Sequence, residues 1–252
     1  MSRALSSELL KLRTTRTFYA LVGSSLGLVL LIVGLAAALD NNWEGNSTPP
    51  SIDLLGIAFL CQLFALVLGI LAVTSEFRHG TITPSLLAVP SRTRLISAKL
   101  AVHLGAGLLF GLATVVLILV LSSAIFSLRD IDNSVGGSEL LKVGLGNAFS
   151  IALYAALGVG IGAVVRNQVG AIIGALAWIF VIESLLTIIP GFEDTITKYG
   201  LGGVAGGLSG SDEFTDGGEL LAQVPAGLLL AAYVAIFVIA GTVLLKRRDI
   251  SA

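Results

Sequence analysis

Residues 100–126 read LAVHLGAGLLFGLATVVLILVLSSAIF and contain no Lys, Arg, Asp or Glu. The hydrocarbon core of a bilayer is about 30 Å thick, and an α-helix that rises about 1.5 Å per residue crosses it with about 20 apolar residues. This run is long enough to do so. We therefore predict that it forms a membrane-spanning helix.

Five further runs share this length and character, and Glu183 is the only acid within the whole set: Phe18–Leu39, Leu54–Val73, Val143–Val165, Val169–Ile189 and Val224–Leu245. The chain has 252 residues, 55% hydrophobic and 12% charged, whereas soluble domains have about 25% charged residues. The runs lack the alternation of a membrane β-barrel. The sequence thus predicts an all-α membrane protein, residues 1–252 forming one domain of six spans.

Basic residues gather in the segments that a six-span path places on one side. Twelve of the 15 Lys and Arg lie in residues 1–16, 74–99, at Arg166 and in the C-terminal tail Lys246–Arg248, whereas twelve of the 16 acids lie in the other loops. Because Lys and Arg mark cytoplasmic loops, we expect both termini in the cytoplasm. The net charge of −1 gives no indication of a nucleic-acid partner.

Residues 1–16 are expected to form an interfacial helix. Leu5, Leu9 and Leu12 recur at helical spacing among basic residues, so this helix would lie flat in the cytoplasmic interface with its apolar side in the lipid. The alternative is a positively charged anchor for the first span.

Residues 74–99 form the largest cytoplasmic segment. Thr83 before Pro84 is typical of a helix start, and Pro90 would end the helix after little more than one turn. The exposed Leu86 and Leu87 of this short helix would need lipid or a partner. On the outer side, residues 190–223 form a long acidic, glycine-rich loop. Tyr199–Leu208 would either dip back toward the membrane or stay solvated.

Few polar residues interrupt the spans, and Gln62, Asn147 and Glu183 are the candidates for a substrate path. A charge in mid-membrane costs at least about 2.5–3.5 kcal/mol on insertion scales, so Glu183 should face protein or water. It would line a pathway or join two helices, or else reach the outer interface. Glycine pairs spaced by four residues predict close helix packing: Gly23/Gly27, Gly107/Gly111, Gly158/Gly162 and Gly170/Gly174.

The catalytic motifs of an energy-coupled enzyme are missing from the sequence. No Lys follows a Gly, so a Gly-Lys-Ser/Thr phosphate loop is excluded. The two His and the single Cys offer no metal site. We expect a chain that is not an enzyme by itself and binds no cofactor or metal.

The cytoplasmic segment carries a resemblance to a known family. Glu76-Phe77-Arg78-His79-Gly80-Thr81-Ile82, followed by Leu86-Leu87, Pro90, Arg92 and Lys99, resembles the loop between spans two and three in permease subunits of bacterial ABC transporters of the type-2 exporter family. The layout of six spans, a basic N-terminal helix and a tight turn between spans four and five is similar too.

The resemblance implies that the short helix is a coupling helix that docks on a separate ATPase, which would bind ATP and Mg. The ATPase-contacting or positioning residues would be Glu76, Arg78, Gly80, Thr81, Leu86 and Leu87. Two permease copies and two ATPases would assemble in the bacterial plasma membrane, in contact with its lipid. The substrate path would lie between the permeases, near spans two and five.

We therefore expect the permease subunit of an ATP-driven exporter of a hydrophobic or amphipathic drug, lipid or peptide. One alternative is a secondary transporter or channel that uses Glu183 as a proton or ion site. Another is a membrane scaffold or immunity protein that transports nothing.

Overall fold

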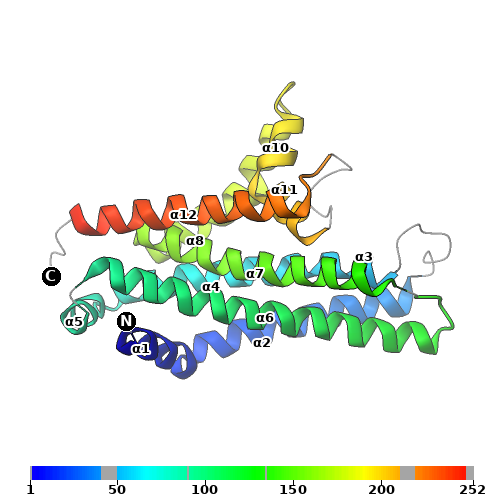
Figure 1. Cartoon of the computed structure of the whole chain (residues 1–252), viewed down its shortest axis with the longest axis horizontal. Coiled ribbons are helices and arrows are strands. Elements are labelled where there is room, and N and C mark those ends of the chain that lie inside the picture. The colour runs from blue at the N-terminus through cyan, green and yellow to red at the C-terminus, as the bar shows by residue number, and fades with distance from the viewer. Residues whose placement is uncertain (1, 41–49, 90, 134, 211–218, 248–252) are drawn as a thin grey trace.

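The computed structural model describes residues 2–40, 50–89, 91–133, 135–210 and 219–247. Within these ranges the chain is helical apart from short connections and has no strand. Six helical segments are long and apolar enough to cross a membrane, and Figure 1 shows them as an elongated bundle. The prediction of an all-α protein with six spans is confirmed.

The described helices follow one another along the chain with these bounds: α1 Ser2–Thr14, α2 Arg16–Leu39, α3 Pro50–Leu54, a 3-10 turn Leu55–Ala58, α4 Phe59–Arg78, α5 Ile82–Ala88, α6 Arg92–Leu128, α7 Gly137–Val165, α8 Gln168–Ala177, a π-helical turn Trp178–Ile182, α9 Glu183–Thr187, α10 Glu193–Tyr199, α11 Leu201–Ser209 and α12 Gln223–Arg247. Helices α4 and α6 extend well beyond the apolar runs. Residues 74–78 and 92–99, half of the segment 74–99, therefore continue these two spans, and α5 lies between them.

Helix α7 is the centre of the bundle and packs against α4, α6 and α12. Glycines allow this close approach: a Cβ built on Gly158 would lie 2.9 Å from Gly69 Cα, and one on Gly111 would lie 2.7 Å from Ala148 Cα. The pairs Gly107/Gly111 and Gly158/Gly162 thus serve packing, as predicted.

The other two glycine pairs do not pack as predicted. A Cβ on Gly23, Gly27 or Gly174 would meet nothing within 4 Å, and one on Gly170 would meet only the side chain of Asn167. The packing prediction is therefore wrong for these pairs within the chain. The open space at Gly170 and Gly174 bears on the cavity described below.

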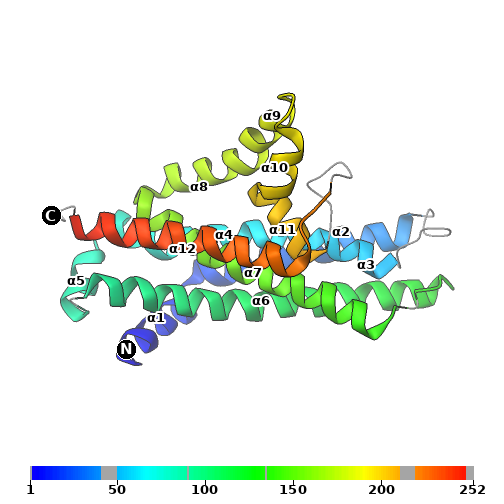
Figure 2. The same cartoon turned by 45° about the horizontal axis from the view of Figure 1, so that its top comes forward.

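The fifth span leans away from the rest of the bundle (Figure 2). It is interrupted by the π-helical turn, and α10 and α11 then lead back to the bundle. Helix α11 lies against α7 and α12, and Gly202–Ser209 are buried. Residues 201–209 thus form a buried returning helix instead of a solvated loop.

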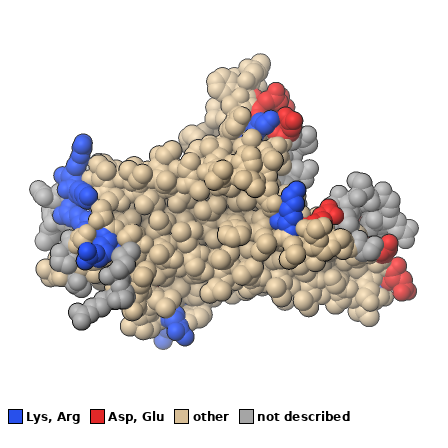
Figure 3. All heavy atoms as spheres, viewed as in Figure 1, with Lys and Arg blue, Asp and Glu red and all other residues tan. Residues whose placement is uncertain are grey.

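Charge divides the two ends of the molecule. Figure 3 shows that Lys and Arg gather mainly at the end that carries α5 and both termini, whereas Asp and Glu gather at the opposite end. This agrees with the loop tally on which the predicted orientation rests. Arg248 and the acids between positions 41 and 49 and between 211 and 218 lie outside the described residues.

Candidate functional site: a charged cluster beneath α5

The turn from α4 into α5 depends on a glycine. Gly80 has φ +67°, in the left-handed region that favours glycine, although a Cβ there would meet nothing within 4 Å. Helix α5 then begins at Ile82 with Thr81 at its N-cap position, and Ser85 N donates to Thr81 O at 3.2 Å. The prediction of Thr83 as N-cap was wrong. Pro84 takes the third helical position, where a missing N–H has no intrahelical partner to lose.

Helix α5 points one leucine outward. Ile82 is buried, Leu86 is half-buried, and Leu87 is 78% exposed. The helix is thus anchored on one side and presents an apolar side chain on the other. Burying such a side chain stabilises a contact by about 1.5–3 kcal/mol.

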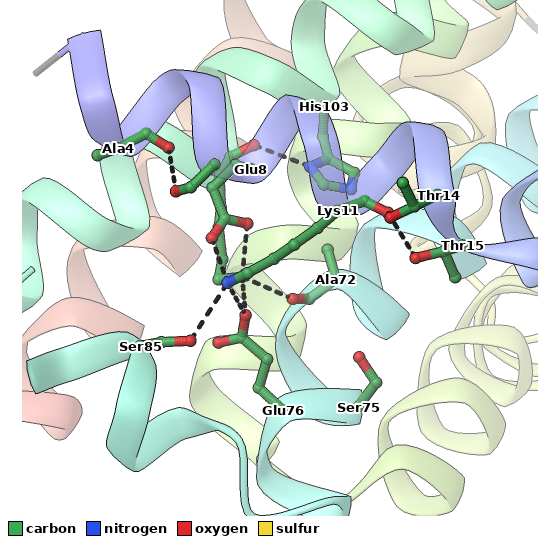
Figure 4. Close-up of polar contacts among 12 residues, drawn as sticks. Ala4, Glu8, Lys11, Thr14, Thr15, Ala72, Ser75, Glu76, Ser85 and His103 are labelled. Carbon is green, nitrogen blue, oxygen red and sulfur yellow. Dashed lines mark hydrogen bonds and ion pairs between the residues drawn. The ribbon is translucent and has the colours of Figure 1, made fainter. Parts of the chain in front are cut away.

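Beneath α5, one lysine joins three helices. Lys99 of α6 is 1% exposed, and its Nζ lies 2.7 Å from Glu8 Oε2 of α1 and 2.7 Å from Glu76 Oε1 of α4. The same Nζ donates to Ala72 O at 3.0 Å. Figure 4 shows this group of contacts between α1 and the ends of the spans. A buried charge is tolerated only when it is paired in this way.

A second lysine extends the cluster to α5. Lys11 Nζ of α1 lies 2.8 Å from Glu8 Oε1 and 2.7 Å from Glu76 Oε1, and it donates to Ser85 Oγ of α5 at 3.2 Å. Two carboxylates and two ammonium groups balance one another. We call Glu8, Lys11, Glu76, Lys99 and Ser85 the charged cluster.

Ion pairing outweighs burial in its effect on the pKa values of Glu8 and Lys11 in α1. Burial alone would raise the pKa of Glu8, but the charges of Lys99 and Lys11 and their hydrogen bonds hold it below its ordinary value. Burial would likewise lower the pKa of Lys11, but hydrogen bonds to Glu76 and Glu8 and their charges raise it. The docked α1 thus stabilises the charged forms of its own residues.

Helix α1 packs on the bundle through a face that the leucine spacing does not mark. Ala4 and Glu8 are buried, whereas Leu9 and Leu10 are 47% and 63% exposed. The leucine pattern gives no indication of a role for Glu8. It is the only acid before Asp40, in a segment rich in Lys and Arg, and that isolation was the available signal.

Three further basic residues at this end hold helix ends together. Arg78 Nη1 donates to Gln168 Oε1 of α8 at 3.2 Å. Arg166 Nη2 donates to Leu244 O at 2.7 Å, and Arg92 Nη1 donates to Leu245 O. The last two fix the C-terminal turn of α12, where backbone carbonyls lack intrahelical partners.

The structure does not bring the three substrate-path candidates together. Gln62 is 2% exposed in α4, and Asn147 is fully buried in α7, where its Nδ2 donates to Val143 O and Ser209 O at 3.1 Å each. Glu183 alone lines a large cavity. Their role in a substrate path stays a prediction.

Glu183 caps the returning helix. Its carboxylate accepts from Leu201 N at 2.7 Å and Gly202 N at 3.0 Å, at the N-terminus of α11. Trp178 Nε1 donates to the same carboxylate at 3.0 Å. A negative charge at this position is favourable because the unpaired N–H groups of a helix start point at it.

Comparison with known proteins gives a result that matches this geometry. No curated protein matches the sequence. The family model described as "ABC-2 family transporter protein" matches residues 4–184, a range that includes the whole charged cluster, α5 and the first five spans as far as Ser184. The resemblance seen between Glu76 and Lys99 is thereby confirmed, and the chain belongs to the ABC-2 family of transporter proteins.

Proposed function

We propose that this chain is the permease subunit of an ATP-driven exporter, and that α5 docks on a separate ATPase subunit which binds ATP and Mg. Membership of the family supports a permease. The observation that carries the docking proposal is Leu87, which is 78% exposed on a short helix at the basic end of the molecule. An aliphatic side chain displayed on a supported helix is a suitable anchor for a groove in a partner.

The supports of α5 fit a transmitting role. The turn at Gly80 links it to α4, Lys11 joins Ser85 to α1, and Lys99 ties α1 to the base of α6. Helices α4 and α6 continue as the second and third spans. A push on α5 would therefore move two spans and α1 together.

The assembly proposed is two permeases with two ATPases in a bacterial plasma membrane, with the permease termini in the cytoplasm. The basic end, which carries α5 and both termini, supports that orientation. The cargo would be a hydrophobic or amphipathic drug, lipid or peptide. The alternative, a secondary transporter or channel that uses Glu183 as a proton or ion site, would be active without an ATPase and would lose its pH dependence in Glu183→Gln.

The docking proposal is tested by co-expressing the tagged chain with the ATPase encoded beside it and measuring how much ATPase is recovered. We expect Leu87→Asp to lower recovery at least tenfold, because it places a charge in the proposed groove. Leu128→Asp is the matched control, since Leu128 is 86% exposed at the far end of α6. Equal recovery with both variants, or no recovery with the unaltered chain, would contradict the proposal.

A further inference from the structure

A cavity of about 520 Å³ lies where the fifth span leaves the bundle. One wall comes from α8, the π-helical turn and α9, the opposite wall from α7 and α12, and α10 and α11 border it as well. Figure 2 shows the divergence of α8 and α9 from α12 that creates this space. Sites for drug-sized molecules have volumes of about 300–1,000 Å³.

Aromatic side chains concentrate on this cavity. Trp178, Tyr199, Tyr233 and Phe237 all line it, although the whole chain has only 2 Trp and 4 Tyr. Two of them are held in place: Trp178 Nε1 donates to Glu183 Oε1 at 3.0 Å, and Tyr233 Oη donates to Tyr199 O at 2.7 Å. The negative faces of such rings attract cations, by about 2 kcal/mol or more when water is excluded.

Among the described residues that line the cavity, Glu183 is the one with a charged side chain. The donors described for it are three neutral N–H groups, and a carboxylate can accept about four hydrogen bonds. The contrast with the charged cluster is informative, because there two lysines neutralise Glu8 and Glu76. Among the described residues, the groups that donate to Glu183 are neutral dipoles, so a cation bound in the cavity would be the one that pairs with this carboxylate.

Small residues keep the space open. Gly170 and Gly174 of α8 line the cavity, and a Cβ on Gly174 would meet nothing within 4 Å. Gly158 of α7 is the opposite case, because a Cβ there would collide with the α4 backbone. A Cβ can therefore be added at Gly174 without contacting other protein atoms, and further side-chain atoms there would enter the cavity.

We propose that this cavity binds a hydrophobic cation, namely an amine or quaternary onium group carried on a drug-sized apolar body. The apolar body would fill the space beside α8, and the cation would lie between the aromatic rings and Glu183. That such a cation is the exported cargo rests on the proposed function. The binding itself is a property of this chain alone.

The test uses the purified full chain in lipid nanodiscs without any ATPase, and two probes of nearly the same shape and opposite charge. These are tetraphenylphosphonium and tetraphenylborate. We expect saturable binding of the cation at least tenfold tighter than that of the anion. Equal binding of the two ions, or binding of neither, would overturn the proposal, and it would point to an ordinary lipid-filled space.

Two variants localise the binding. Gly174→Leu adds bulk to the cavity and should weaken cation binding at least tenfold, whereas Gly27→Leu, also free of contacts within 4 Å but on α2, should leave it unchanged. Glu183→Gln keeps an oxygen acceptor for α11. It should weaken binding of the cation about tenfold and tighten binding of the anion. Unchanged cation binding in Gly174→Leu would overturn the assignment to this cavity, even if Glu183→Gln failed to fold.

The outcome is separable from the docking test. If the chain binds the cation but recovers no ATPase, the site stands and the exporter proposal fails. If ATPase recovery depends on Leu87 but the cation shows no preference, the exporter proposal stands and the cation site fails.

Discussion

Replacing Lys99 by methionine removes the ammonium group that lies 2.7 Å from both Glu8 and Glu76. Methionine keeps much of the aliphatic stem, so the change is mainly one of charge. Two carboxylates would then share the cluster with Lys11, which is 45% exposed at its side chain. We expect α1 to undock from the bundle.

The magnitude follows from burial. Removing one partner of a buried ion pair costs about 3–5 kcal/mol. When α1 undocks, Glu8 becomes hydrated again, so the substitution cannot cost more than the free energy with which α1 docks. We therefore take the lower end of this range, about 3 kcal/mol, as the loss of docking free energy. Because each 1.4 kcal/mol is a factor of ten, the undocked fraction should rise on the order of a hundredfold. Lys11→Met removes a half-exposed partner and should raise it only about fivefold, for roughly 1 kcal/mol.

Trypsin cleavage after Arg13 reports the undocked state, because cleavage of a transiently opened segment follows its population when opening is fast. The matched control is Lys142→Met, the same substitution at an exposed position near the opposite end of the molecule. The double variant Glu8→Gln with Lys99→Met removes the uncompensated charge and should be cleaved more slowly than Lys99→Met alone. Wild-type cleavage in Lys99→Met, or no recovery in the double variant, would refute the cluster as the anchor of α1.

The other predictions concern pH and glycine. Because the pKa of Glu8 is lowered on docking, the contribution of Glu8 to the docking free energy of α1 is complete above its ordinary pKa of about 4.3. This contribution is lost as pH falls through the lower docked value. The pKa of Lys11 is raised, so its contribution to the docking free energy of α1 is complete below its ordinary pKa of about 10.4 and is lost as pH rises through the higher docked value. A pair of fluorophores on α1 and α5 should therefore move apart at both low and high pH. Gly80→Ala should lower the Tm by roughly 2–4 °C, since φ +67° costs a side chain about 1 kcal/mol, and a Tm equal to wild type would contradict this. Gly158→Ala should lower the Tm more strongly than Gly80→Ala, because the added Cβ at position 158 would meet the backbone of α4. Gly174→Ala should not lower the Tm, since its Cβ would meet nothing. Equal losses of Tm in Gly158→Ala and Gly174→Ala would contradict the packing described.

The spans were predictable because hydrophobicity over about 20 residues needs no knowledge of the fold. The helix ends were less so. Glu76 and Arg78 seemed to belong to a loop, yet both continue α4, because a helix extends past the membrane core wherever its side chains find partners. The start of α5 was misplaced by two residues because Pro84 suggested a first helical position, whereas the left-handed turn at Gly80 brings the chain into helix at Ile82.

The charged cluster was beyond prediction for a different reason. Three of its contacts, from Lys11 to Glu76 and Ser85 and from Lys99 to Glu8, join residues 65 to 91 positions apart. An amphipathic pattern in α1 selects leucines, not the acid on the buried face. Yet a single acid in a basic segment is itself a signal, and a search for spaced leucines overlooks it. In a terminal segment whose basic residues favour anionic lipid, one carboxylate weakens membrane attraction unless a cation within the protein pairs with it. Glu8 and Lys99 satisfy that condition, so α1 is fixed to the spans by an ion pair and its exposed Leu9 and Leu10 remain free for lipid.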